Sequence, residues 1–249
     1  MPPTWKAVRG AGAGAAAVLA VVGSALAAPP ALMLPADMPR DDDARVRYVA
    51  ERASVIGRVS GETFRLRPRV FEYLLEHPEL ATHVTQALKI GPYRCWREPD
   101  GLWVDDGAGA SGRFTIVSAA VGRRVIYLRG QYKQSGPVPA IQGQAVAVLE
   151  YTVQPTADGH ALITPTLTGF LKIDNAFIEM LSRLLKPLAA AKAERLARRV
   201  VGDFAKTARA IDADPARVHD ELRRRPDVRP AELEDLRRLL NLPDHSQPH

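Results

Sequence analysis

The sequence predicts an α+β fold in which one antiparallel sheet is combined with helices, and three observations lead to this prediction. Residues 67–90 carry apolar side chains at helical spacing, interrupted by Pro78. Segments with strand-like alternation then follow one another from 93 to 173 through short turns, which is typical of an antiparallel meander. A long amphipathic helix is predicted from Asp174 to about Ile211, because its apolar residues recur on one side.

The composition is that of an ordinary globular protein. The chain has 249 residues, of which 46% are hydrophobic and 25% are charged. This length suffices for one large domain or two small ones. The formal net charge of +6 suits an anionic partner, such as a membrane surface or a nucleic acid, but does not decide between the two.

The N-terminal segment has the pattern of a cleaved secretory signal peptide. Lys6 and Arg9 precede a short apolar stretch, and Ala25-Leu26-Ala27 form an A-x-A site, so we expect cleavage after Ala27. The apolar stretch is too short for a comfortable membrane span. The mature protein is therefore expected to be periplasmic or secreted, and the alanine-rich signal favours a bacterial envelope protein. Export argues against a nucleic-acid partner.

The rest of the chain is expected to form three further segments. Prolines and the acidic run Asp41–Asp43 indicate an exposed, flexible leader. The tail is predicted to contain two short helices that start near Pro215 and Pro230. We interpret this tail as a small appendage packed against the domain rather than as a helix-turn-helix. The predicted boundaries are 1–27 for the signal peptide, 28–49 for the leader, 50–211 for the main domain and 212–249 for the tail.

Proline and glycine mark the ends of the predicted elements in the first part of the main domain. The segment 53–66 favours a strand, and Pro68 is well placed to open the first short helix. Pro78 ends this helix and opens the second one, which Gly91 and Pro92 stop. We therefore expect one strand followed by two short helices.

The meander is predicted from its turns. A hairpin turn is expected at Pro99-Asp100-Gly101, and a second turn at Val121-Gly122. Two longer alternating segments follow, 143–155 and 160–173. Pro165 lies inside the last one and would make it an edge strand or a bulged one, because proline cannot donate a backbone hydrogen bond.

The long helix carries apolar residues on one side and basic residues on the other. This one-sided stripe predicts a helix that lies on a protein surface rather than one that spans a membrane. Pro187 should kink the helix or divide it into two, because proline removes a hydrogen bond inside a helix.

The sequence predicts no catalytic, metal or cofactor site. The GAGASG segment at 107–112 matches G-x-G-x-x-G, but a strand follows it where dinucleotide binding needs a helix. The histidines lack metal-ligand spacing. Cys95 is the only cysteine, and on a strand it is expected to be a buried structural thiol. Glu150 and Tyr127 are the only mild acid–base candidates, and exposure of Glu150 would weaken an enzymatic interpretation.

The order of strand, two short helices, meander and long helix resembles the START-like superfamily, which includes the polyketide cyclase/dehydrase and lipid-transport proteins. The resemblance is carried by SVIGRVSGETFRLRPRVFEYLLEHPEL (54–80) and by DNAFIEMLSRLLKPLAAAKAERLARRVVGDFAKTA (174–208). It implies a helix-grip fold, in which the long helix lies across a curved antiparallel sheet. It also implies a hydrophobic ligand between helix and sheet, without any required enzymatic activity.

This resemblance leads to a first set of ligand-binding candidates. The proposed walls of the site are formed by sheet aromatics and by the apolar stripe of the long helix. They are Trp96, Trp103, Tyr127, Phe177, Leu181, Leu184 and Leu188. The basic residues Arg195, Arg198 and Arg199 would face outward and contact anionic membrane lipids.

Two alternatives stay open at this point. The sheet aromatics can instead fill the core of a non-catalytic envelope interaction module. An enzyme of the cyclase or hydrolase type would need at least one carboxylate, histidine or tyrosine that points into a cavity.

Overall fold

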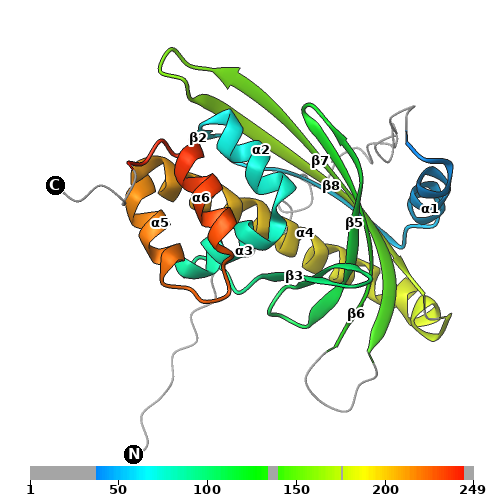
Figure 1. Cartoon of the computed structure of the whole chain (residues 1–249). Coiled ribbons are helices and arrows are strands. Elements are labelled where there is room, and N and C mark those ends of the chain that lie inside the picture. Colours follow the sequence, from blue (N-terminus) through cyan, green and yellow to red (C-terminus); the bar gives the residue numbers. More distant parts are fainter. Residues whose placement is uncertain (1–37, 134–139, 175, 244–249) are drawn as a thin grey trace, which may run out of the picture. The chain divides into compact units, whose positions relative to one another are not determined.

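The computed structural model describes residues 38–133, 140–174 and 176–243, with side chains except between 176 and 193. These ranges belong to one compact unit, Leu34–His249 (Figure 1). The predicted signal peptide at 1–27 and the first part of the predicted leader lie outside the described residues. Export and cleavage after Ala27 therefore stay predictions.

The described strands form one antiparallel sheet with the order β1-β8-β7-β6-β5-β4-β3, and β2 also pairs with β8. This order confirms the antiparallel meander, and the helices around the sheet confirm the α+β class. The strands are β1 (Val55–Ser60), β2 (Phe64–Leu66), β3 (Arg94–Glu98), β4 (Gly101–Asp105), β5 (Ala110–Ala120), β6 (Arg123–Tyr132), β7 (Ile141–Pro155) and β8 (Ala161–Ile173).

The predicted short helices are present, and proline opens each of them. Proline suits the first helical position because its missing N–H would have no partner there. The long helix α4 contacts β1, β2 and β8, and the short helices other than α1 gather near its C-terminal end (Figure 1). The helices are α1 (Arg40–Glu51), α2 (Pro68–Glu76), α3 (Pro78–Ala87), α4 (Ala176–Ala213), α5 (Pro215–Arg223) and α6 (Pro230–Leu239).

Helix α1 corrects the prediction of a flexible leader at 28–49, because residues 40–49 are helical. Val46 and Val49 lie three residues apart on one side of α1, and both are fully buried. The acidic run Asp41–Asp43 occupies the first turn of α1, where negative charge interacts favourably with the helix dipole. A short apolar stripe and a well-placed acidic turn thus make a helix from residues that looked like linker.

Strand β8 is central in the sheet, so the prediction that Pro165 lies in an edge strand is wrong. The reason is local: β1 ends opposite Thr166 and β2 begins opposite Ile163, so the neighbouring strand is interrupted next to Pro165. The Pro165 carbonyl still accepts a hydrogen bond from the Gly61 amide at 2.8 Å. The position at which Pro165 lacks an N–H group therefore lies beside the gap between β1 and β2, where no strand would accept a hydrogen bond from it.

Helix α4 continues from Ala176 to Ala213 through Pro187, so proline does not divide it into two helices. A kink at Pro187 stays a prediction.

The main core joins α2, α3, the second half of α4, the β2 side of the sheet and the tail. Leu222 of α5 and Leu236 of α6 are fully buried in the same cluster as Phe64, Phe71 and Ile163. The two predicted tail helices are confirmed, and they pack against the domain as expected. They share its core, however, so the predicted boundary at 211/212 does not separate two cores.

Candidate functional site

The two faces of the sheet have different neighbours. The ring centroids of Phe64 and Phe204 lie 5.9 Å apart, so α4 packs against the face that Phe64 occupies. We call this the inner face. On the opposite, outer face, the Arg45 guanidinium of α1 lies 5.4 Å from the centre of the Tyr127 ring. Because side chains alternate along a strand, the register assigns every strand residue to one of these faces.

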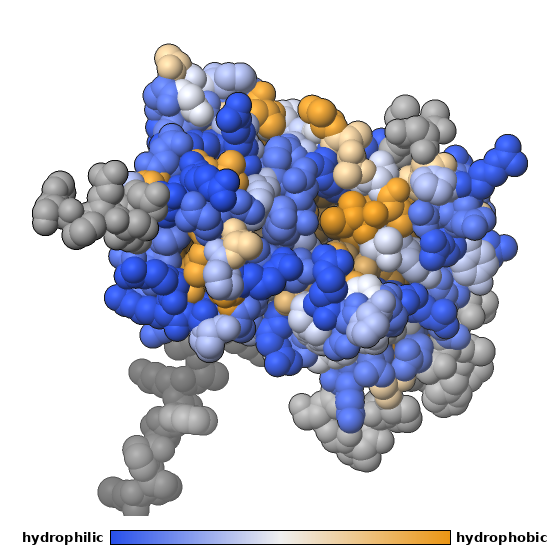
Figure 2. Space-filling view, in the orientation of Figure 1, coloured by the Kyte–Doolittle hydropathy of each residue, from blue (hydrophilic) through white to orange (hydrophobic). Residues whose placement is uncertain are grey.

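The inner face is fully buried at one end and partly buried at the other. Near the tail helices it carries fully buried core residues such as Ile163 and Ala161. Further along, the buried side chains of Val55, Val59 and Phe114 lie among apolar side chains that are only partly buried. Figure 2 shows hydrophobic residues gathered at the surface of the strand region. We call this set the apolar surface: Leu102, Val104, Ile116, Ile126, Leu128, Ala145, Ala147, Leu167 and Leu171.

Two glycines form the lowest part of the apolar surface. Gly57 and Gly169 are cross-strand partners, and Ala147 pairs with Gly169 on the next strand. A Cβ atom placed on either glycine would meet no atom of the described residues within 4 Å. The sheet therefore presents a shallow, side-chain-free strip between taller leucine and isoleucine side chains.

A polar cluster lies between the fully buried and the partly buried parts of the inner face. Arg124 donates to Glu72 of α2 at 2.5 Å, and the Tyr151 hydroxyl donates to the same carboxylate at 2.7 Å. Burial, followed by the hydrogen bond to Glu72, raises the pKa of Tyr151 to about 12. Arg124 also donates to the Ala120 and Arg123 carbonyls. The cluster ties α2 to β6 and β7.

Sequence reasoning missed this cluster. A signal for it was present in the sequence, because Arg124 alternates in phase with Ile126 and Leu128, so the three side chains share one face of the strand. A charged residue in an otherwise apolar row indicates a buried ion pair. Its partner Glu72 lies far away in the sequence on a helix, and only the tertiary structure brings the two side chains together.

The predicted sheet aromatics lie on the outer face, opposite to the one that was expected. Trp96 and Trp103 are direct cross-strand partners with ring centroids 6.5 Å apart, and each indole donates to a neighbouring carboxylate. The Tyr127 hydroxyl donates to Gln144 at 2.8 Å. Because side chains alternate along a strand, an assignment that is wrong by one residue places a side chain on the opposite face. This finding corrects the predicted face of Trp96, Trp103 and Tyr127. These three residues do not line a site between the sheet and α4.

The predicted residues of the long helix fall into two groups. Phe177, Leu181, Leu184 and Leu188 lie outside the described side chains, so their role as a ligand wall stays a prediction. Arg195, Arg198 and Arg199 are exposed, as expected. Arg198 pairs with Glu194 at 2.6 Å, and Arg199 lies 3.7 Å from Asp203 and 5.7 Å from the Tyr93 ring centre. Membrane contact by these arginines is untested.

The mild acid–base candidates have no catalytic surroundings. Glu150 points to the outer face, its side chain is 42% exposed, and it lies 3.7 Å from Arg58. Burial raises the pKa of the Cys95 thiol to about 12, so it is protonated and unreactive at neutral pH. The described residues hold no cluster of three or more His, Cys, Asp or Glu side chains suited to a metal ion.

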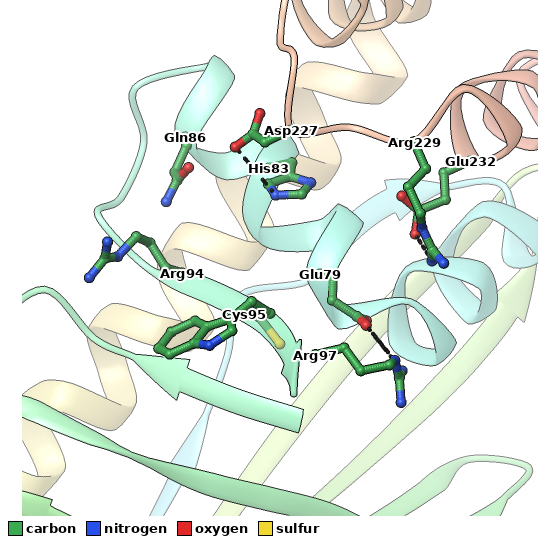
Figure 3. A pocket seen from close by; sticks show the side chains of 10 residues that line it. Glu79, His83, Gln86, Arg94, Cys95, Arg97, Asp227, Arg229 and Glu232 are labelled. Carbon is green, nitrogen blue, oxygen red and sulfur yellow. Dashed lines mark hydrogen bonds and ion pairs between the residues drawn. The ribbon is translucent and has the colours of Figure 1, made fainter. Parts of the chain in front are cut away.

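A concave feature lies beside β3. A groove of about 410 Å³ runs between α3, β3 and the segment that leads into α6 (Figure 3). Most of its lining residues are charged or polar, in contrast to those of the apolar surface, and Cys95 and Trp96 also line it. In Figure 3, Glu79 faces Arg97 and His83 faces Asp227. We call it the polar groove.

His83 forms part of the wall of the polar groove. Its Nε2 atom lies 3.6 Å from Asp227 Oδ2, and its Nδ1 atom is shielded from solvent without a hydrogen-bond partner among the described residues. Burial lowers the pKa of His83, and the Asp227 carboxylate partly opposes this shift. Hydrogen bonds from Arg225 lower the pKa of Asp227. The imidazole is therefore neutral near pH 7.

Comparisons with known proteins do not identify a family for this chain. No protein-family model matches the chain, and no curated protein matches it. Among solved structures, the truncated norcoclaurine synthase from Thalictrum flavum is similar, with 12% identity and a TM-score of 0.29 over 59% of this chain and 91% of that chain. The fold assignment rests instead on the sheet order and on the position of α4, which are compatible with a helix-grip fold.

Proposed function

We propose that this protein binds a lipid or another hydrophobic small molecule between the sheet and α4. The observation that carries the proposal is the apolar surface, which faces the interior of the fold but is only partly buried. Removing apolar area from water is favourable by about 25 cal/mol per Å². A partly buried apolar surface of this kind is therefore a favoured place for an apolar ligand.

The parts of the inner face have distinct roles in this proposal. Gly57 and Gly169 let the ligand approach the sheet backbone closely, because they carry no side chain. The leucine and isoleucine side chains on either side provide the contact area. Arg124, Glu72 and Tyr151 close one end, and their hydrogen bonds to one another leave them poorly suited to hold a ligand head group. The ligand is thus held mainly by apolar contact.

The proposal includes an envelope location. The sequence pattern up to Ala27 supports export, and a carrier of a hydrophobic molecule would suit a compartment bounded by membranes. Exposed Arg195, Arg198 and Arg199 would add contacts with anionic lipids, each worth about 1 kcal/mol near a membrane surface. N-terminal sequencing of the mature protein, purified from the periplasm of an expressing bacterium, checks the cleavage site.

None of the described helices has the length and apolarity needed to cross a membrane.

The first experiment tests for a bound molecule directly. The protein is purified without detergent, extracted with organic solvent, and the extract is analysed by mass spectrometry. We expect one class of apolar molecule at close to stoichiometric amount. An empty protein that also fails to bind the fluorescent probe 1-anilinonaphthalene-8-sulfonate would contradict the proposal and would favour an interaction module with a filled core.

The second experiment tests the location with a matched pair of variants. Gly169→Leu places a side chain over the open strip, and probe affinity should fall at least about tenfold, since a difference of about 1.4 kcal/mol suffices for that. Leu162→Phe adds bulk to the same strand on the outer face, where Leu162 is exposed, and should leave affinity unchanged. Circular dichroism confirms that both variants fold. Equal affinity of the two variants would place the site elsewhere.

A further inference from the structure

The polar groove contains two arginine–glutamate pairs with the same arrangement. Arg97 lies 3.0 Å from Glu79, and Arg229 lies 2.5 Å from Glu232. In both pairs the carboxylate is buried, whereas the arginine side chains are 62% and 66% exposed. The negative charge thus lies at the floor of the groove and the guanidinium groups lie at its rim.

This arrangement makes the groove rich in free hydrogen-bond donors. A guanidinium has several N–H groups in a planar fork. Arg97 uses Nε and one terminal nitrogen on a single oxygen of Glu79, and Arg229 uses one terminal nitrogen on Glu232. Both arginine side chains are otherwise largely exposed. Asp227 is the exposed acid of the groove, but both of its oxygens accept hydrogen bonds from Arg225.

Each pair lies at the start of a helix. Glu79 lies in the first turn of α3 and Glu232 in the first turn of α6, so two helices begin at this groove. The N-terminal end of a helix carries a partial positive charge. The hydrogen bond to Glu232 is the main cause of the raised pKa of Arg229, and Glu79 also contributes, which places both arginines in the same local field.

We propose that the polar groove binds a small molecule through a carboxylate or phosphate group held by Arg97 and Arg229. Planar guanidinium groups suit such oxyanions, because two parallel N–H groups match two oxygens. The volume of about 410 Å³ fits a small metabolite rather than a polymer. This site differs in chemistry from the apolar surface, which it adjoins because Arg97 pairs with Leu102 and Cys95 with Val104, and it does not depend on ligand binding there.

His83 makes binding at this site depend on pH. The charged groups that face its ring are Glu79 of α3, Arg225 and Asp227 of the α5–α6 connection, and Glu232 of α6. An anion bound in the groove would stabilise the protonated imidazole, so anion binding and proton uptake favour each other. Affinity should therefore rise as pH falls below the ordinary range of histidine.

The experiment is an amide NMR titration of the mature protein at constant ionic strength, with inorganic phosphate and acetate as separate probes at pH 7. We expect saturable shifts in α3 and in residues 225–232, with a dissociation constant on the order of 1 mM for the better anion. Saturation by phosphate alone identifies a phosphate site, and saturation by acetate identifies a carboxylate site. Shifts that grow linearly with both anions would overturn the proposal.

Variants identify the residues. Arg97→Lys and Arg229→Lys each retain a positive charge opposite the buried glutamate but lose the planar fork, and each should weaken binding about fivefold or more. Arg198→Lys is the matched control, because Arg198 is similarly exposed and pairs with Glu194 on α4. Equal affinities in all three variants would overturn the proposal. Gly169→Leu should leave anion binding intact, which separates this test from that of the apolar site.

Sulfate tests the pH dependence, because its charge is constant between pH 5.5 and 8. We expect several-fold tighter sulfate binding at pH 5.5 than at pH 8, and His83→Leu should abolish this difference. The unpartnered Nδ1 atom makes His83→Leu a mild substitution for folding. An unchanged pH dependence in His83→Leu would refute the role of His83.

Discussion

At the scale of single residues, Arg124 shows how one buried charge organises the inner face. Its side chain is 8% exposed, and it is satisfied by the Glu72 carboxylate and by two backbone carbonyls. Burying a guanidinium is costly unless every donor direction finds an acceptor. Because Glu72 comes from α2, this requirement fixes where α2 lies against β6 and β7.

Glu72→Ala should lower the free energy of unfolding by about 2 kcal/mol, because it removes a hydrogen bond between charged groups and leaves Arg124 buried without its carboxylate. Tyr151→Phe removes only the hydroxyl bond to Glu72 and should cost about 1 kcal/mol. Urea unfolding followed by circular dichroism measures both. If Glu72→Ala cost no more than Tyr151→Phe, the Arg124–Glu72 pair would not be the stabilising contact.

At the scale of elements, the junction between β1 and β2 shows why β8 tolerates a proline at its centre. The sheet edge formed by β1 and β2 is broken at residues 61–63, next to Pro165. Val201 of α4 packs into this break, because Gly61 carries no side chain there. The break therefore serves both the proline and the close approach of α4.

Gly61→Ala should destabilise the protein by about 1–3 kcal/mol, because its Cβ would overlap Val201 and lie 2.9 Å from the Pro165 ring. Gly57→Ala on the same strand is the matched control, since its Cβ meets no described atom within 4 Å. It should be neutral or slightly stabilising. Thermal unfolding of the two variants side by side measures the difference, and equal melting temperatures would rule out close packing at Gly61.

At the scale of the whole molecule, the tail completes the main core. Val218, Leu222, Leu236 and Leu240 are buried together with the aromatic residues of α2 and β2. A helical segment that buries its apolar face against the core unfolds together with it. The tail is thus part of the cooperative unit, although its sequence reads as two separable short helices.

Leu236→Ala should lower the free energy of unfolding of the whole domain by about 3 kcal/mol, because it opens a cavity in a fully buried position. Tryptophan fluorescence reports on β3 and β4, whereas circular dichroism reports on the helices. We expect the two unfolding transitions to shift together. Val121→Ala, at a fully exposed turn, is the control. Loss of helical signal before the tryptophan transition would show that the tail unfolds on its own.

The sequence by itself determined the α+β class, the meander and the start of each short helix after β2, because alternation and proline positions are local signals. It also predicted the exposure of Arg195, Arg198 and Arg199 on α4, but not the burial of Asp203 or the exposure of Val200. It did not determine which face of the sheet α4 covers, and so it assigned Trp96, Trp103 and Tyr127 to the wrong face. Strand parity says which residues share a face, and only long-range packing says which face is covered.

Only the tertiary structure decided where the apolar surface and the polar groove lie. Both depend on pairs of residues that are distant in sequence: Gly57 beside Gly169, and Arg97 in the same groove as Arg229. A side chain becomes part of a binding site only through the residues that surround it. The packing of α2, α3 and the tail on the sheet determines which residues these are. Local sequence signals carry no information about such contacts, since they report on the backbone conformation of a segment and not on what lies across from it.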